Sequence, residues 1–434
     1  MSIKHADPFY RKLYALLIGL SVLCLLLVGL TWLQGPRIRL ASIDTEKAAT
    51  QAGQRLILHT NQPLGTITKD QVTISPDTPI EISGNGNTNI VQFKQRLAYQ
   101  TTYTVTLTSG KHRLKYAFTT AKPAIYYAEQ NVTGTADVIR RNVLGTDKDE
   151  IVYNAEEILD FAVLSDSLII CTRNTDYTNN LIKLDLKTKK ETAIKLPKPG
   201  TVAHMYSAPD KQSFGFSFSP KSYEKNLNSA LFLVHSTDLR PRLVKSFANK
   251  PLQILDWKFA PDSATILAQL PDTTTLITDS RTGKPPTPLG QYPGIGGFSA
   301  DGAKVIMQDK DGPLVIDLKT NTQTRLAQKE VGSDSFVTST LPFHNQEGFL
   351  MNGQAFVGSY YLDYIQIQSE GTQTMLHQTG KTEGIIATEL SPNDQYAALI
   401  ISEPQDGIVR LEARVIKLQT GKIDIIPNAT KIHW

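Results

Sequence analysis

The chain has 434 residues, of which 40% are hydrophobic and 20% charged, and it contains only two cysteines. This composition excludes a disordered chain and a disulfide-stapled fold, and the length suits about two or three domains. The chain carries 45 Lys and Arg residues against 41 Asp and Glu residues. It therefore lacks the concentrated positive charge of a nucleic-acid-binding domain, and we expect no nucleic-acid partner.

The first predicted element is an apolar helix over residues 13–33, which contain no charged side chain. A helix of that length spans roughly 31 Å, about the thickness of a bilayer core, and the run is longer than the apolar core of a signal peptide. We therefore expect a single-pass transmembrane helix in a bacterial cell membrane. Residues 1–12 are then cytoplasmic and the rest is extracytoplasmic, because long domains translocate largely regardless of charge.

Residues 38–120 alternate apolar and polar side chains in short runs such as RLILHT, NIVQFK and YTVTLTS, separated by turn-forming residues. This period of two predicts antiparallel strands that form a β-sandwich. The segments GQRLILHTNQPL, LAYQTTYTVTLTSG and YAFTT resemble a bacterial Ig-like domain, although the cysteine pair of antibody-type domains is missing. The resemblance implies a spacer or an adhesive platform.

A group of basic residues stands out in this module, and residues 36–120 hold ten Lys or Arg residues against five acidic ones. Two interpretations are open: a patch for anionic wall polymers or lipid head groups, or the ordinary charged solvent side of strands. The group consists of Lys94, Arg96, Lys111, Arg113 and Lys115.

Residues 121–434 contain a degenerate repeat of about 45 residues, marked by turn sequences such as APDK, APDS, SADG and SPND. A second motif, in segments such as LIKLDLKTKK and PLVIDLKTNT, follows the first with the same period. Four strands per repeat is the pattern of a propeller blade, which buries its faces only against neighbouring blades. The turns resemble those of the WD40-like blades of TolB-type propellers. We expect an all-β propeller with seven blades, or alternatively six.

The strand count also predicts how the ring closes. Seven copies of the outer three strands can be traced, but only six internal copies of the innermost strand. The segment 430–434 resembles the inner-strand sequence Leu255-Asp256-Trp257. We expect this segment to supply the inner strand of the first blade and so remove two open sheet edges.

No signature of catalysis or of a metal site appears in the sequence. The eight histidines show no HExxH spacing, no GxSxG elbow is present, and no phosphate-binding loop occurs. Asp309 and Asp311, like Asp147 and Asp149, resemble the start of a calcium loop, but acidic hairpin turns explain them better. We therefore predict no catalytic residues, no metal ligands and no cofactor.

The remaining candidate chemistry is recognition. The segments 173–180, 220–228 and 352–359 are predicted as long loops on one face of the propeller, and exposed rings on a rigid scaffold suit a binding surface, although packing of each loop on itself is equally open. We expect a non-catalytic binding or scaffolding protein for a protein or cell-wall glycan; the alternative is an enzyme, of hydrolase or lyase type, that uses the central channel. The binding residues themselves are not identified, and the candidate rings are Tyr177, Tyr223, Phe356 and Tyr360.

Overall fold

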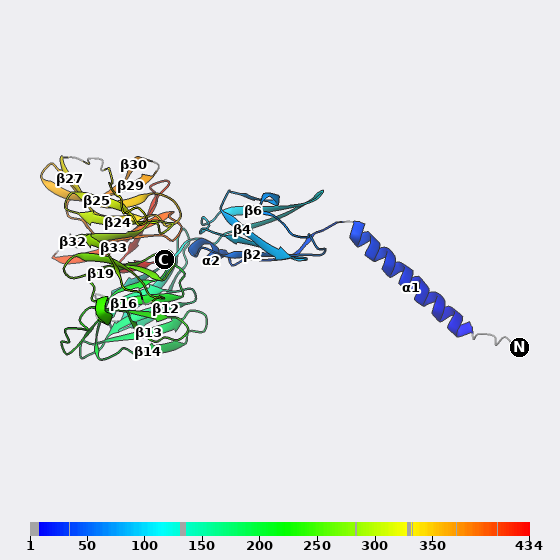
Figure 1. Ribbon diagram of the computed structural model, residues 1–434, viewed down its shortest axis with the longest axis horizontal. Coiled ribbons are helices and arrows are strands. Elements are labelled where there is room, and N and C mark those ends of the chain that lie inside the picture. Colours follow the sequence, from blue (N-terminus) through cyan, green and yellow to red (C-terminus); the bar gives the residue numbers. More distant parts are fainter. Residues whose placement is uncertain are drawn as a thin grey trace. The chain divides into compact units, whose positions relative to one another are not determined.

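The computed structural model describes residues 8–33, 35–130, 136–282, 284–327, 331, 333–369, 371–405 and 407–434. The chain divides into two compact units, each with its own sheets and core (Figure 1). The first unit comprises Met1–Ala48, Gly53–Leu97 and Thr101–Thr120, and the second comprises Ala49–Ala52, Ala98–Gln100 and Ala121–Trp434.

The first helix, α1, extends over Pro8–Leu33, so the helix expected at residues 13–33 is present. Among the described residues, however, no helix combines the length and the apolar character that crossing a membrane requires. The predicted transmembrane helix at 13–33 is therefore wrong: neither the length of that run nor its lack of charged residues was enough to identify a membrane span. The assignments built on it, a cytoplasmic segment 1–12, a membrane partner and a bacterial cell-membrane location, are withdrawn with it.

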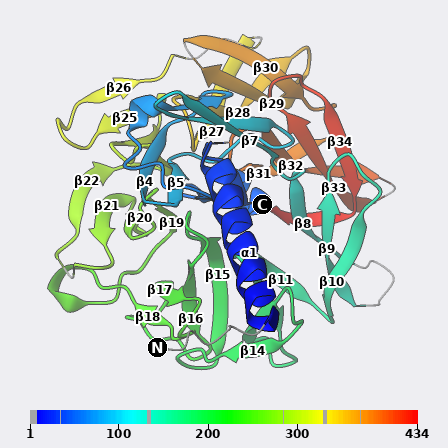
Figure 2. The ribbon, with the colours of Figure 1, turned by 90° about the vertical axis from the view of Figure 1, so that its right-hand side faces the viewer.

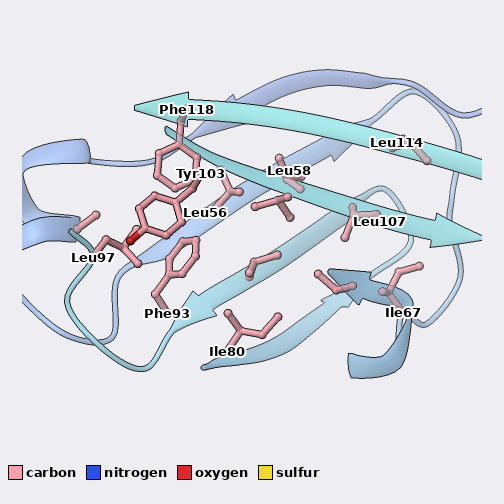
Figure 3. Close-up of a cluster of buried hydrophobic side chains, with 14 of the residues drawn as sticks. Leu56, Leu58, Ile67, Ile80, Phe93, Leu97, Tyr103, Leu107, Leu114 and Phe118 are labelled. Atoms are coloured by element: carbon pink, nitrogen blue, oxygen red, sulfur yellow. The ribbon is translucent and has the colours of Figure 1, made fainter. Parts of the chain in front are cut away.

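The first unit contains two antiparallel sheets that share one hydrophobic core (Figure 3). Strand alternation accounts for this core, because β6 points Tyr103, Val105 and Leu107 to the side that the core occupies. One sheet has the order β1-β2-β5-β4 and the other has the order β3-β6-β7. The elements are β1 (Ile38–Ser42), α2 (Thr45–Thr50), β2 (Arg55–Thr60), η1 (Lys69–Gln71), β3 (Val72–Ser75), β4 (Ile80–Asn85), β5 (Thr88–Phe93), β6 (Thr102–Ser109) and β7 (His112–Thr119).

The second unit is a ring of seven four-stranded antiparallel sheets, the blades of a propeller (Figure 2). The blades are written below from the inner to the outer strand. Blade 1 is β35 (Ala429–His433), β8 (Ala124–Glu129), β9 (Asp137–Val143) and β10 (Asp149–Ala155); blade 2 is β11 (Ile158–Val163), β12 (Ser167–Arg173), β13 (Asn179–Asp185) and β14 (Glu191–Ile194). Blade 3 is β15 (Gly200–Ser207), β16 (Ser213–Pro220), β17 (Ala230–His235) and β18 (Arg242–Leu243); η2 (Phe247–Asn249) follows it.

The remaining four blades follow in chain order. Blade 4 is β19 (Asp256–Phe259), β20 (Thr265–Gln269), β21 (Thr274–Asp279) and β22 (Thr287–Gln291); blade 5 is β23 (Gly294–Phe298), β24 (Lys304–Asp309), β25 (Gly312–Asp317) and β26 (Gln323–Arg325). Blade 6 is β27 (Ser333–Pro342), β28 (Phe349–Val357), β29 (Tyr360–Ser369) and β30 (Thr372–Gln378); blade 7 is β31 (Gly384–Leu390), β32 (Tyr396–Gln405), β33 (Ile408–Lys417) and β34 (Ile423–Pro427).

The ring closes as predicted. β35 pairs antiparallel with β8, with Ile432 opposite Tyr127 and His433 opposite Tyr126. The side chain of Ile432 is buried in a cluster that also contains Val415 and Ile400 from blade 7. The last strand of the propeller therefore completes the first blade and packs against the last one.

The two repeated motifs are turns at the same end of each blade. In the first motif the fourth residue has positive φ in four copies, at Lys211, Ser263, Gly302 and Asp394. In the second motif, Asp185 and Asp317 each accept backbone N–H bonds from the two residues that close the turn. These local hydrogen bonds explain why Asp recurs in the repeat, since its carboxylate replaces a backbone acceptor in the turn.

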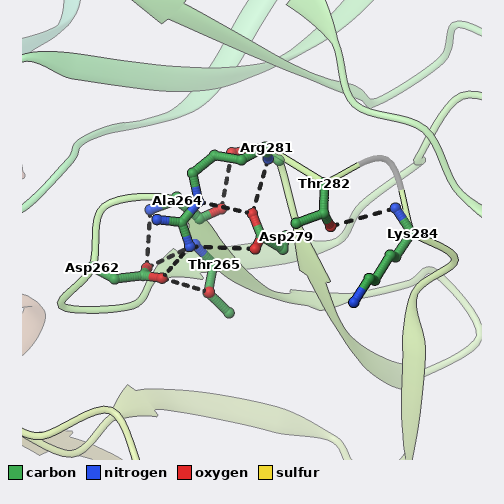
Figure 4. Close-up of polar contacts among 8 residues, drawn as sticks. Asp262, Ala264, Thr265, Asp279, Arg281, Thr282 and Lys284 are labelled. Atoms are coloured by element: carbon green, nitrogen blue, oxygen red, sulfur yellow. Dashed lines mark hydrogen bonds and ion pairs between the residues drawn. The ribbon is translucent and has the colours of Figure 1, made fainter.

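In blade 4 the two motifs are joined (Figure 4). Asp262 accepts hydrogen bonds from the backbone N–H groups of Ala264 and Thr265, at 3.0 and 2.8 Å, and from Arg281 at 2.9 Å. Arg281 also bonds Asp279. Burial would raise the pKa of Asp262, but the backbone bonds outweigh it and lower that pKa.

Replacement of Asp262 by alanine should lower the free energy of unfolding by about 1–2 kcal/mol, because the turn loses its acceptor. Urea unfolding followed by the fluorescence of buried Trp257 measures the change. The matched control is Asp272→Ala, which removes a single bond to the Thr274 N–H and should have a smaller effect. Equal losses in the two variants would contradict this account.

Candidate functional site

One end of the propeller collects the candidate binding residues. Because the strands of each blade alternate in direction, the connections between second and third strands lie at the same end as the links between blades. We call this end the loop face. The loops that carry Tyr177 and Tyr223 belong to blades 2 and 3, and Tyr360 begins β29 in blade 6. The predicted aromatic residues therefore all lie on or beside the loop face.

Tyr177 is held in a tight turn although its side chain is 75% exposed. Its backbone N–H bonds the Asn174 carbonyl at 3.0 Å, and the Asn174 N–H bonds the Thr178 carbonyl at 2.8 Å. Asp176 accepts the Thr178 hydroxyl at 2.6 Å. The backbone at Tyr177 has a φ of 64°, which a residue other than glycine seldom adopts. The turn thus fixes the backbone at Tyr177, whose ring is largely exposed to solvent.

An ion pair connects this turn to the next blade. Lys221, in the loop of blade 3, lies 2.9 Å from Asp176. The Thr178 hydroxyl and then Lys221 lower the pKa of Asp176 to about 2, so the carboxylate is charged at neutral pH. Tyr223 is 78% exposed in the same loop as Lys221. Two exposed tyrosines are therefore carried by two loops that are linked to each other.

The loop of blade 3 also has its own internal bonds. The Asn228 N–H donates to the Glu224 carbonyl at 3.0 Å, and Gln253 donates to the Asn228 carbonyl at 2.9 Å. Glu224 pairs with Lys198 at 2.6 Å. The loop that carries Tyr223 is therefore held by hydrogen bonds and an ion pair, none of which involves the tyrosine ring.

Blade 6 supplies a second aromatic group. The ring of Phe356 lies 5.2 Å from that of Tyr361, and Phe336 lies 6.4 Å from Tyr361. The ammonium group of Lys381 lies 4.7 Å from the centre of the Tyr360 ring. Phe356 is only partly exposed and packs within its own hairpin, which was the open alternative for the predicted rings.

The predicted loop at 352–359 is largely strand. β28 continues to Val357, and only the turn between Val357 and Tyr360 is loop. Sequence reasoning missed Phe336, Tyr361 and Lys381 as members of this aromatic group. Tyr361 directly follows a named candidate, but Phe336 comes from a different strand, and only the register of β27 against β28 reveals its position.

The inner strands bring together a charged cluster that the sequence did not predict. His433 Nδ1 lies 2.6 Å from Glu389 of β31, and His433 Nε2 lies 3.7 Å from Asp160 of β11. The ring of Phe161 packs edge-on against the imidazole at 4.8 Å. Burial alone would lower the pKa of His433, but Glu389 and Asp160 outweigh it and raise that pKa to about 9. The imidazole is therefore charged at neutral pH and ties together blades 7, 1 and 2.

A second charged cluster lies between blades 3 and 4. The ammonium group of Lys258 lies 4.1 Å from the centre of the Tyr206 ring and 3.5 Å from Asp256. Burial would lower the pKa of Lys258, but Tyr206 and Asp256 together raise it. A lysine nucleophile needs a lowered pKa and a general base needs a pKa near the working pH, so neither Lys258 nor His433 is tuned for those roles.

The described residues also contain no recognisable metal site. Within the part of the chain that the structure describes, no group of three or more His, Cys, Asp or Glu side chains is arranged to hold a metal ion. Asp309, one of the calcium-like pairs, is instead bound at 2.8 Å by Arg325. This carboxylate therefore pairs with an arginine on another strand of its own blade.

Comparison with known proteins finds similar solved structures but no matching family or curated relative. No protein-family description and no curated protein matches the sequence. Among solved structures, the chain is similar to TolB from Acinetobacter baumannii, with 13% identity, coverage of 84% of this chain and 82% of that one, and a TM-score of 0.42. It is also similar to the β-propeller domain of the Trilobed protease from Pyrococcus furiosus, with 10% identity, coverage of 73% and 91%, and a TM-score of 0.46.

A third similarity is to a prolyl endopeptidase, with 8% identity, a TM-score of 0.52, and coverage of 78% of this chain and 49% of that one. At such identities the likeness concerns the fold alone, because propellers host unrelated functions. The neighbours include TolB proteins and a β-propeller domain, and the expected resemblance of residues 38–120 to an Ig-like domain finds no support among them.

Proposed function

We propose that this protein is a non-catalytic binding protein that holds a protein or glycan partner on the loop face of its propeller. The observation that carries the proposal is the pair of exposed rings at Tyr177 and Tyr223 on loops fixed by hydrogen bonds and by the Asp176–Lys221 ion pair. A loop whose backbone is already fixed loses little conformational freedom on binding, and tyrosine is among the residues that most often dominate binding energy.

The enzyme alternative is less well supported. It requires an ionisable group in the channel that can accept a proton or attack a substrate near neutral pH. The described residues of the inner strands instead hold His433 and Lys258 in their charged forms through carboxylate and tyrosine neighbours. These clusters join neighbouring blades, which is a structural role.

The partner is to be identified by site-specific crosslinking in the full-length protein. A photoreactive residue in place of Tyr177 or Tyr223 should capture a partner that the same residue at Ile151 or Ile425 does not capture. Ile151 and Ile425 are matched controls because both are apolar side chains exposed on outer strands. Equal capture from the two regions, or capture from the control positions alone, would contradict the proposal.

The double variant Tyr177→Ala/Tyr223→Ala should then weaken binding of the captured partner by about thirty- to a thousandfold, because hot-spot rings each contribute about 1–2 kcal/mol. Its unfolding temperature should remain close to that of the wild type, since both side chains are exposed. The control variant Ile151→Ala/Ile425→Ala should bind as the wild type does. Titration calorimetry measures the affinities, and unchanged binding by the tyrosine variant would reject the loop face as the site.

A further inference from the structure

A long stretch of the first unit carries only positive charge. From Ile82 to Ala128 the chain contains no Asp or Glu, yet it holds six Lys or Arg residues. Acidic residues make up 41 of the 434 positions, so several would be expected in a run of this length. This run includes β6 and β7, two of the three strands of one sheet.

The outer side of that sheet can be read from its alternation. On β6 the core-facing residues are Tyr103, Val105 and Leu107, so the intervening threonines point away from the core. On β7, Leu114 and Phe118 face the core (Figure 3), which turns the alternate residues outward. We call this outer side the hydroxyl face. Its residues from these two strands are Thr102, Thr104, Thr106 and Thr108 of β6, and Arg113, Lys115, Ala117 and Thr119 of β7.

The register places each cation beside hydroxyl groups. Arg113 lies opposite Thr108, and Lys115 lies opposite Thr106, which in turn lies opposite Thr73 of β3. Neighbouring strands are about 4.8 Å apart, and alternate residues along a strand are roughly 6.7 Å apart. In the first row both Arg113 and Thr108 are exposed, so a cation and a hydroxyl can contact the same anionic group. In the second row Thr106 is buried, and the exposed hydroxyl on the line of Lys115 is that of Thr73, two strands away, within reach of a neighbouring group of one chain.

These cations are available for a ligand. Arg113 and Lys115 are exposed, and among the described residues neither forms an ion pair with a carboxylate. Lys94, from the same basic group, differs because it lies 2.7 Å from Glu81 of the other sheet. Of the basic residues named from the sequence, Lys94 is thus paired with a carboxylate, whereas Arg113 and Lys115 lie exposed on the hydroxyl face.

We propose that the hydroxyl face binds a linear phosphate polymer that carries no bases. Phosphate oxygens accept hydrogen bonds from Arg, Lys and Thr side chains, which are the donors present here. The face carries no aromatic residue among its outward positions, so it offers no platform on which nucleic-acid bases could stack. The absence of carboxylates leaves nothing on the face to repel a chain of negative charges.

The test is binding of fluorescently labelled inorganic polyphosphate to the full-length protein, measured by anisotropy over a range of salt concentrations. The wild type should bind, and its affinity should fall steeply with salt because counterions are released. The variant Arg113→Gln/Lys115→Gln should bind at least about tenfold more weakly, and the slope of log affinity against log salt should decrease in magnitude by roughly 1.4 to 1.8. The charge-conserving variant Arg113→Lys/Lys115→Arg should retain most of the affinity.

The matched control is Arg39→Gln/Arg55→Gln, which removes the same charge from exposed positions of the other sheet. If the control weakened binding as much as the test variant, binding would depend on net charge and the proposed face would be wrong. The proposal would also fail if the wild type did not bind polyphosphate at low salt, or if oligo(dT) of equal charge bound more tightly. The last result would identify a nucleic-acid site instead. Unchanged unfolding temperatures show that each variant is folded.

Discussion

Replacement of Ile432 by aspartate should lower the free energy of unfolding of the propeller by about 4 kcal/mol or more, since the substitution removes a buried side chain and introduces a charge without a partner. Ile432 is 5% exposed and lies in the cluster that contains Ile125 and Tyr127 of blade 1 and Val415 of blade 7. The substitution therefore weakens the first blade and its contact with the last blade at the same time.

The control for this prediction is Lys431→Asp, on the same strand with its side chain exposed. It adds the same acidic group but leaves the cluster intact, so its unfolding midpoint in urea should stay near that of the wild type. Hydrogen exchange adds a local readout, because the amides of β8 that pair with β35 should lose protection first in Ile432→Asp. Equal midpoints for Ile432→Asp and the wild type would show that closure by β35 contributes little to stability.

The elements that could be predicted from sequence are those fixed by local chemistry. Asp262, Asp185 and Asp317 form hydrogen bonds to residues two or three positions away. Each turn can therefore be recognised from a short motif in the sequence. The alternation of apolar and polar residues that predicts a strand is also a local pattern. Closure by residues 430–434 was predictable because the count of inner strands fell one short of the count of outer strands.

The segment 352–359 was predicted as a loop but is largely strand, because packing rather than local conformation selects one of its residues. A β-carbon at Gly353 would lie 2.3 Å from the ring of Tyr364 and 2.6 Å from the carbonyl oxygen of Phe336. The position is part of a strand that a neighbouring ring approaches closely, and the sequence alone does not distinguish that from a turn.

The cluster at His433 could not be predicted for a related reason. His433, Glu389 and Asp160 lie on the inner strands of three consecutive blades, and the first and last of them are far apart in the chain. Only closure of the ring brings them together. The three residues do not belong to one sequence motif, so a search for local motifs cannot predict that they are in contact.

The same cluster makes the stability of the propeller depend on pH. The pKa of His433 in the folded protein, about 9, is above the value of about 6.5 for an unperturbed histidine. Because the folded state binds this proton more tightly, the contribution is fully present below about pH 6.5 and is lost as pH rises through about 9. A difference of this size corresponds to about 3 kcal/mol of stability.

We therefore expect His433→Gln to be less stable than the wild type by up to about 3 kcal/mol at pH 6, and nearly as stable as the wild type at pH 10. Urea unfolding of both proteins across this range gives the difference at each pH, in which other titrating groups largely cancel. The control is His235→Gln, the same substitution at an exposed histidine of β17 whose ring lies 2.9 Å from the Thr237 hydroxyl, and this variant should unfold close to the wild type. Glu389→Gln tests the cause, since removal of the carboxylate 2.6 Å from the imidazole should remove most of the pH dependence. A His433→Gln difference that is equal at pH 6 and pH 10 would show that the imidazole is not held in its charged form by Glu389 and Asp160.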